Sequence, residues 1–184
     1  MRRIFGGSIK LGPNLGPAIV ALDLWINAVG ASQFPLLGTE SRKVNVADFI
    51  ASVAETLVGD ARGLEKHLLR KSIEETLFTA AGQNVQISPQ VAQSRWARYI
   101  KLHGQPAMIE LFLANHLWNV LWFKAGDVFG QTDGRAVEYP MHRLRRTCRL
   151  LVNAVCQSKG LTDSISLPVA EQVIGALEAS ISPS

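Results

Sequence analysis

The sequence has only two cysteines, Cys148 and Cys156, among 184 residues. Both fall within one helical pattern, and a rise of about 1.5 Å per residue would place them roughly 12 Å apart along the axis. A disulfide requires a much shorter separation. No other cysteine or suitably spaced histidine joins them to form a metal site. We therefore expect both to be reduced core residues, as is usual in cytoplasmic proteins.

Long apolar runs are also missing. The most apolar stretch, residues 106–123, is interrupted by Glu110, Asn115, His116 and Asn119. Four polar side chains in a run of about 20 residues argue against a membrane span and favour a buried central helix. The first ten residues contain no apolar region of the length that a secretory signal needs. We therefore expect a cytoplasmic protein.

Recognisable catalytic motifs are absent as well. No glycine-rich segment carries the lysine and hydroxyl pattern of a phosphate-binding loop. No nucleophile occurs in the sequence context of an elbow or a triad. Glu74, Glu75 and Glu110 have no carboxylate or histidine partners at metal-binding spacing. The sequence thus predicts no catalytic residue, no metal site and no cofactor.

What the sequence does contain is a strong core pattern. Hydrophobic residues make up 47% of the chain and charged residues 18%, which is typical of a globular protein and not of a disordered one. The length suits one domain, and apolar residues recur at intervals of three and four. This predicts an all-α fold, a single-domain helical bundle of six to seven helices. Glycine and proline are concentrated in residues 1–17, which we expect to form a flexible arm before an α-helical domain at 18–184.

Breaker and capping residues set the expected helix ends. Pro17 suits a first helical turn, Gly30 and Gly59 suit helix stops, and Ser88-Pro89 is a good N-cap pair. A glycine- and aspartate-rich loop is expected at 125–139, with a short extended piece at 136–139. The expected helices span 18–29, 46–58, 64–81, 90–103, 106–124, 141–158 and 169–181.

The clearest surface feature lies in the expected helix at 141–158. One face is apolar, and the remaining positions carry a run of basic residues: His142, Arg143, Arg145, Arg146 and Arg149. Four arginines on a solvent face suit a nucleic-acid backbone. They also suit an acidic partner protein, or an ordinary solvated surface. The net charge of +4 permits an anionic partner without requiring one.

A second basic group, at Arg95, Arg98 and Lys101, has Trp96 and Tyr99 interleaved. It resembles a surface that combines stacking with charge. At helical spacing, however, Trp96 and Tyr99 are typical of a core stripe, and we favour that interpretation.

An arginine and a histidine separated by four to six intervening residues resemble the motif of the HEPN ribonucleases, in which paired helical subunits cut RNA. Chance alone produces such spacings in a chain with this many arginines, and the tight matches lack the polar residue that usually follows the arginine in that family. A ribonuclease therefore stays an alternative. The matching pairs are Arg62 with His67, Arg98 with His103, and Arg135 with His142.

Asn115, His116 and Asn119 form a polar strip on the otherwise apolar helix at 106–124. Such a strip is either a ligand-facing cluster or a set of core polar groups that hydrogen-bond to neighbouring helices, and the second is the commoner arrangement.

From about residue 34 to residue 155, the order of features resembles the B component of the Qat anti-phage defence systems. The similarity covers layout and scattered residues. It lies in Phe34-Pro35-Leu36-Leu37-Gly38, the helix at 46–59, the segment 63–82 with Lys71-Ser72-Ile73-Glu74-Glu75-Thr76-Leu77, the apolar helix at 109–122 and the arginine-rich helix at 143–149.

This resemblance implies a non-catalytic helical subunit, or a protein substrate, of a multi-protein bacterial anti-phage defence complex. Implied partners are an ATPase, a QueC-like enzyme and a TatD-like nuclease of the same operon. The family's B protein is thought to be modified near a glycine-rich N-terminus. The resemblance implies that the corresponding modification site here is the arm at Gly6 and Gly7. The family's usual glycine-rich start follows the first methionine directly, so this arm departs from the pattern, and the chain is shorter than is typical of the family.

Overall fold

The structure, a computed structural model, describes residues 9–30, 45–83, 87–129, 138–161 and 164–182. Within these ranges it contains seven helices and no strand, which confirms the all-α prediction. The helices are α1 (Leu15–Gly30), α2 (Val46–Val58), α3 (Gly63–Ala80), α4 (Pro89–His103), α5 (Gln105–Phe129), α6 (Glu138–Ser158) and α7 (Leu167–Ile181).

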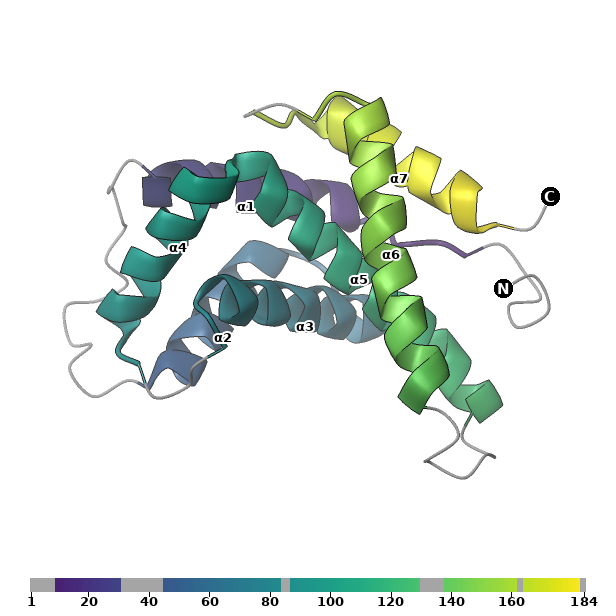
Figure 1. The fold of residues 1–184 in the computed structure, drawn as a ribbon, viewed down its shortest axis with the longest axis horizontal. Helices are drawn as coiled ribbons and strands as arrows, with labels where there is room; N and C mark the ends of the chain where they lie inside the picture. The colour runs from purple at the N-terminus through teal and green to yellow at the C-terminus, as the bar shows by residue number, and fades with distance from the viewer. Residues whose placement is uncertain (1–8, 31–44, 84–86, 130–137, 162–163, 183–184) are drawn as a thin grey trace.

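Helices α3 and α5 pack side by side and form the centre of the bundle (Figure 1). Helix α2 lies along α3, and α4 contacts both α1 and α5. Helix α6 crosses α5 and contacts α7, which in turn packs against α1. The buried apolar residues of all seven helices belong to one core, so the described chain is a single packing unit.

Trp96 of α4 joins four helices in that core. Its side chain is fully buried, and its ring lies edge-on to Trp25 of α1, with 5.3 Å between ring centroids. The same ring stacks on Phe49 of α2 at 5.9 Å. Its indole N–H donates to the carbonyl of Leu77 in α3 over 2.8 Å. The core interpretation of this residue is therefore confirmed.

Helix ends with a clear capping residue fall where the sequence predicts them. Asn45 caps α2, since its Oδ1 accepts from the backbone N–H of Asp48 over 2.8 Å, and Gly59 follows the last residue of that helix. Ser88 accepts from the backbone N–H of Val91 at the start of α4. These side chains satisfy amide groups that have no partner within the helix.

The loop expected at 125–139 is shorter than predicted, because both neighbouring helices extend into it. Helix α5 continues through Gly126 to Phe129, and Ala125 is fully buried. A glycine inside a helix costs only about 1 kcal/mol, so the packing of α5 overrides it. Helix α6 begins at Glu138 and includes Pro140 in its first turn, where a missing N–H breaks no helical bond. The extended piece expected at 136–139 is thus wrong for its last two residues.

The arm expected at 1–17 is wrong for residues 9–17, and residues 1–8 lie outside the described part of the chain. Helix α1 begins at Leu15, and Ile9 and Leu11 are buried in the core. Asn14 binds Glu65 of α3 twice, through its backbone N–H and its side-chain amide, each over 2.7 Å. Gly12, which lies between Leu11 and Asn14 in the sequence, has a backbone φ of +105°. A Cβ atom added to it would lie 2.5 Å from the Glu65 carboxylate. Residues 9–14 are therefore a packed segment that requires a glycine at this turn.

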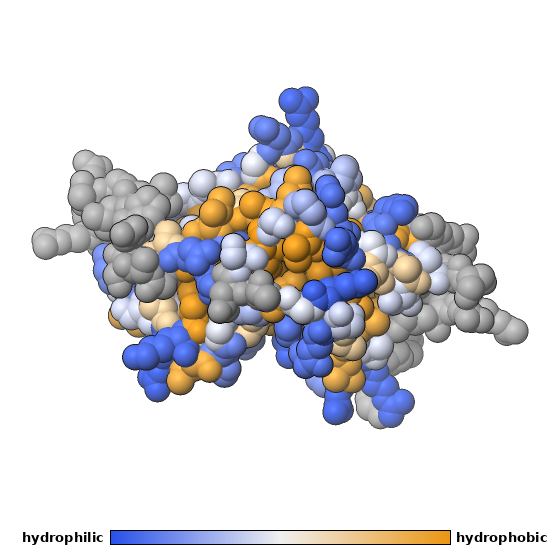
Figure 2. Space-filling model, turned by 90° about the horizontal axis from the view of Figure 1, so that it is seen from above, coloured by the Kyte–Doolittle hydropathy of each residue, from blue (hydrophilic) through white to orange (hydrophobic). Residues whose placement is uncertain are grey.

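The surface carries apolar residues as well as charge. Seen from above, an apolar area occupies the centre of the face and is bordered by hydrophilic residues (Figure 2). The large apolar side chains that the described surface exposes are Leu24, Leu64, Val91, Leu102, Trp122, Phe123, Leu150 and Leu167.

Candidate functional site

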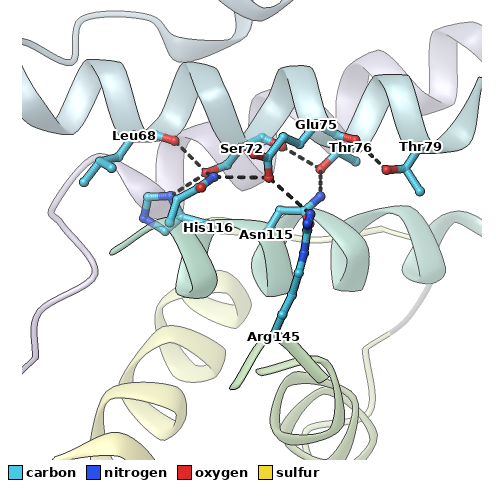
Figure 3. Close-up of polar contacts among 9 residues, drawn as sticks. Leu68, Ser72, Glu75, Thr76, Thr79, Asn115, His116 and Arg145 are labelled. Atoms are coloured by element: carbon cyan, nitrogen blue, oxygen red, sulfur yellow. Dashed lines mark hydrogen bonds and ion pairs between the residues drawn. The ribbon is translucent and has the colours of Figure 1, made fainter. Parts of the chain in front are cut away.

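A line of polar side chains is buried between the two central helices (Figure 3). Burying a polar side chain in a core lowers the stability of the fold unless its polar atoms form hydrogen bonds. We call this line the buried polar seam; its members, all at most 1% exposed, are Ser72 and Thr76 of α3 with Asn115, His116 and Asn119 of α5.

The seam is held together by bonds between the two helices. The Asn115 amide donates to the hydroxyl of Thr76, and the Asn119 amide donates to that of Ser72, each over 3.1 Å. Both hydroxyls donate in turn to carbonyls one turn earlier in α3, which leaves their lone pairs for the amides. The structure therefore supports the core interpretation of the polar strip, in preference to a ligand-facing cluster.

His116 connects the seam to the segment at residues 9–14. Its Nε2 lies 2.9 Å from the carbonyl oxygen of Leu11. A carbonyl only accepts, so Nε2 carries the hydrogen. Nδ1 carries none and lies 3.3 Å from the hydroxyl oxygen of Ser72, whose single hydrogen is donated to the carbonyl of Leu68. Burial lowers the pKa of His116, opposed by its hydrogen bond to Leu11 and by the charge of Glu65. The imidazole is therefore neutral in the folded protein at neutral pH.

This burial predicts an acid-sensitive fold. The unfolded chain binds a proton at His116 near pH 6.5, whereas the folded chain resists protonation to lower pH. Stability from this residue is thus complete above about pH 6.5 and is lost as pH falls, by up to about 1.4 kcal/mol per pH unit. Urea unfolding at pH 7.5 and 5.5 measures it. His116→Gln, which keeps an N–H but does not titrate, should show a smaller difference between the two pH values; an unchanged difference would contradict the assignment.

Three of the four arginines expected to bind an anion, Arg145, Arg146 and Arg149, meet at a cavity of about 440 Å³. About two helical turns of α6 supply most of its wall, and the turn after α3 supplies the rest. We call it the α6 basic cavity; it is lined by Gln83, His142, Arg145, Arg146 and Arg149. The sequence predicted the three arginines as binding residues and placed His142 in the same basic run. It gave no indication of Gln83, which follows α3 and has no local signal.

Arg145 departs from the expected solvent-facing run. Its Nη2 lies 3.5 Å from Glu75 of α3 and 3.4 Å from the side-chain oxygen of Asn115. Its guanidinium also lies over the ring of Trp118, 5.9 Å from the centroid. Arg145 therefore has partners within the fold that its place on the expected solvent face does not indicate, because α6 crosses α5 close enough for it to reach the seam (Figure 3). Its side chain remains 41% exposed.

The other three arginines of α6 are exposed: Arg143, Arg146 and Arg149. Arg146 and Arg149 line the α6 basic cavity, whereas Arg143 lies outside it. Within the described ranges, no carboxylate lies within ion-pair distance of Arg146 or Arg149, and a glutamate touches Arg145 alone among the cavity's basic residues. The cavity consequently has an excess of positive charge.

A second cavity, of about 380 Å³, is also lined by the turn after α3. We call it the α4 cavity. Arg95 is held at its edge by a 2.7 Å hydrogen bond to the carbonyl of Ala81. Tyr99 and His103 pack together there, with 4.6 Å between ring centroids. Burial raises the pKa of Tyr99, the charge of Arg149 lowers it and the charge of Glu110 raises it. The two cavities adjoin, because Gly82 lines one and its neighbour Gln83 lines the other. The α4 cavity is lined by Ala80, Ala81, Gly82, Arg95, Arg98, Tyr99, Leu102 and His103.

The arginine–histidine pairs are placed differently by the fold. Arg98 and His103 both line the α4 cavity. Arg62 is the N-cap residue of α3 and His67 is exposed on that helix, at the opposite end from both cavities. Arg135 lies outside the described residues, as do Gly6 and Gly7 of the expected modification arm. Only the pair on α4 is thus brought to a hollow surface within the part of the chain that the structure describes.

Both cysteines are buried and unpaired, as predicted. Burial raises the pKa of Cys148 to about 11 and that of Cys156 to about 12. Thiols with such pKa values stay protonated at neutral pH and are poor nucleophiles. Their role is to pack α6 against the core.

Among the residues described, no three histidine, cysteine or acidic side chains gather closely enough to hold a metal ion. In the same ranges, no helix has the length and apolarity that would let it cross a bilayer. The class defined by fold and site is thus a helical bundle with two adjoining basic cavities. Comparison with protein-family models, with curated proteins and with solved structures found no match to this chain.

Proposed function

We propose that this protein is a non-catalytic helical subunit that binds nucleic acid through the α6 basic cavity and the adjoining α4 cavity. The observation that carries the proposal is the convergence of Arg146, Arg149 and His142 on one hollow, with no carboxylate neutralising the two arginines in the described chain. Arginine binds phosphate oxygens in pairs through its planar fork. Concave, uncompensated positive charge of this kind attracts polyanions.

The α4 cavity adds the rings of a tyrosine and a histidine, on which bases can stack. Tyr99 and His103 offer ring faces beside Arg98, and bases stack on such rings independently of sequence. Because the adjacent residues Gly82 and Gln83 line the two cavities, a single strand can contact both. This supports binding of single-stranded RNA or DNA in preference to a duplex, whose bases are already stacked.

Binding should weaken steeply with salt. Three phosphate contacts on a single strand give a slope of about −2 in a plot of log K against log salt, or about a 20-fold loss between 50 and 200 mM. Fluorescence anisotropy with an unphosphorylated single-stranded RNA measures this slope. Absence of binding, or binding that salt does not weaken, would contradict the proposal.

The same samples test the ribonuclease alternative, which the shared cavity of Arg98 and His103 favours. A non-catalytic subunit leaves the RNA intact. Cleavage that disappears in His103→Ala, while Arg62 and His67 variants still cut, would instead make the protein a ribonuclease.

We further propose that the protein works within a bacterial anti-phage defence complex, together with an ATPase and a QueC-like enzyme. This rests on the resemblance described above, and the apolar area of Figure 2 supports it because such areas favour contacts between subunits. Leu24 and Leu150 are 64% and 63% exposed, unusually high for side chains of this size. Purification from the native operon, with the intact mass recorded, should recover partners or a mass increase at the Gly6-Gly7 arm. Recovery of the unmodified chain alone would contradict it.

A further inference from the structure

We propose that the α6 basic cavity recognises a phosphate monoester at the end of a nucleic-acid strand. The inference rests on the proposed nucleic-acid function and adds which part of the strand the site selects. It follows from three features of the cavity: its convergent shape, its charge, and the contacts that hold Arg145 in position before a ligand binds.

The lining residues of α6 converge because of their spacing. His142, Arg145, Arg146 and Arg149 stand at positions i, i+3, i+4 and i+7, which a helix places on one face. Gln83 closes the cavity from the turn after α3. Its backbone φ of +55° is rare for a residue with a side chain. All five side chains therefore meet around one volume of about 440 Å³, instead of following a strand along an open track.

The charge of the cavity matches a monoester better than a diester. A phosphate inside a strand carries one negative charge, whereas a phosphate monoester carries about −1.5 to −2 near pH 7 and three strong acceptor oxygens. The cavity presents Arg146 and Arg149 without carboxylate partners in the described ranges, and Arg145 with only Glu75 beside it. Two uncompensated guanidinium groups at one point balance a dianion and overcompensate a monoanion.

Arg145 is already in place before a ligand arrives. Both of its polar contacts, to Glu75 and to Asn115, are made by Nη2. Its Nη1 has no partner within the described part of the chain. Trp118 supports the guanidinium plane from the side. A donor that is held in position loses less rotational freedom when it binds, which favours selective recognition of a small group.

The test compares three single-stranded RNA probes of one sequence: 5′-phosphorylated, 3′-phosphorylated, and hydroxyl at both ends. At physiological salt, fluorescence anisotropy should show at least about tenfold tighter binding of one phosphorylated probe, because the extra charge forms additional charge-assisted hydrogen bonds. The end that shows the preference identifies which monoester is recognised.

Arg149→Gln should reduce this preference to less than about twofold, since it removes a guanidinium from the cavity. Lys159→Gln, an equal loss of charge at an exposed position beyond the end of α6, should keep it. Equal binding of all three probes would overturn the inference while leaving the proposed nucleic-acid function intact. Failure of every probe to bind would overturn both.

Discussion

Replacing Trp96 with alanine should lower the free energy of unfolding by about 3–5 kcal/mol, the usual range for a large aromatic residue removed from a core. The side chain has no exposed surface and contacts residues of α1, α2 and α3 from its place on α4. Its loss leaves a hole at the junction of four helices, where no single helix can move to fill it. Urea unfolding at pH 7.5 measures the change as a lower midpoint at an unchanged slope.

The chain offers a matched control in Trp122 of α5, which is 42% exposed. It stacks on Trp118 at 5.7 Å, so Trp122→Ala should cost about 1 kcal/mol or less. Trp96→Phe keeps an aromatic ring and loses the N–H that binds the Leu77 carbonyl, and should cost about 1–2 kcal/mol. Equal losses in the two alanine variants would show that Trp96 is not the junction of the core.

Reversing the charge of the α6 basic cavity should abolish most nucleic-acid binding. The double variant Arg146→Glu plus Arg149→Glu is expected to weaken binding of single-stranded RNA by at least about 100-fold. Two charge-assisted hydrogen bonds at about 1.5 kcal/mol each account for that factor before any repulsion is added. The salt slope should also become shallower by about 1.4, since two phosphate contacts are lost. Arg145 is left unchanged because its ion pair with Glu75 would confound the result.

The control carries the same change of net charge elsewhere. Arg62 and Lys159 are exposed, and Arg62 lies at the end of α3 opposite the cavity. Arg62→Glu plus Lys159→Glu should therefore keep binding within a few-fold of the original protein. If both double variants lose binding equally, the effect is one of overall charge, and the cavity has no special part in it.

Local signals predicted most of the helical boundaries. Helix α2 matches its prediction at both ends because Asn45 and Gly59 are capping residues with strong local preferences. Where a boundary depended on packing, the prediction was wrong. Gly126 was interpreted as part of a loop, yet burial of Ala125 carries α5 beyond it. Burial of Ile9 and Leu11 was not predicted, because both occur in a glycine- and proline-rich segment.

The sequence predicted only those residues of the candidate site that lie together on α6. Spacing placed His142, Arg146 and Arg149 together, and the structure brings them to one cavity. The contact of Arg145 with Glu75 joins residues that lie 70 positions apart, and it depends on how α6 crosses the central pair of helices. No periodicity within α6 contains that information, so the partners of Arg145 and the participation of Gln83 required the three-dimensional structure.

The packed segment at residues 9–14 has a consequence for how the protein is made. The ammonium group of Lys10 and the backbone N–H of Leu11 are both held by the carboxylate of Glu178, each over 2.8 Å and across 168 and 167 residues. Ribosomes release the chain at about 5–20 residues per second, so this carboxylate appears roughly 8–33 s after the residues that it holds. During that interval the ammonium group of Lys10 and the backbone N–H of Leu11 lack the carboxylate that binds them in the folded protein. This contact therefore forms long after residues 9–14 are synthesised, and a delay in synthesising α7 would prolong the time for which these residues lack it.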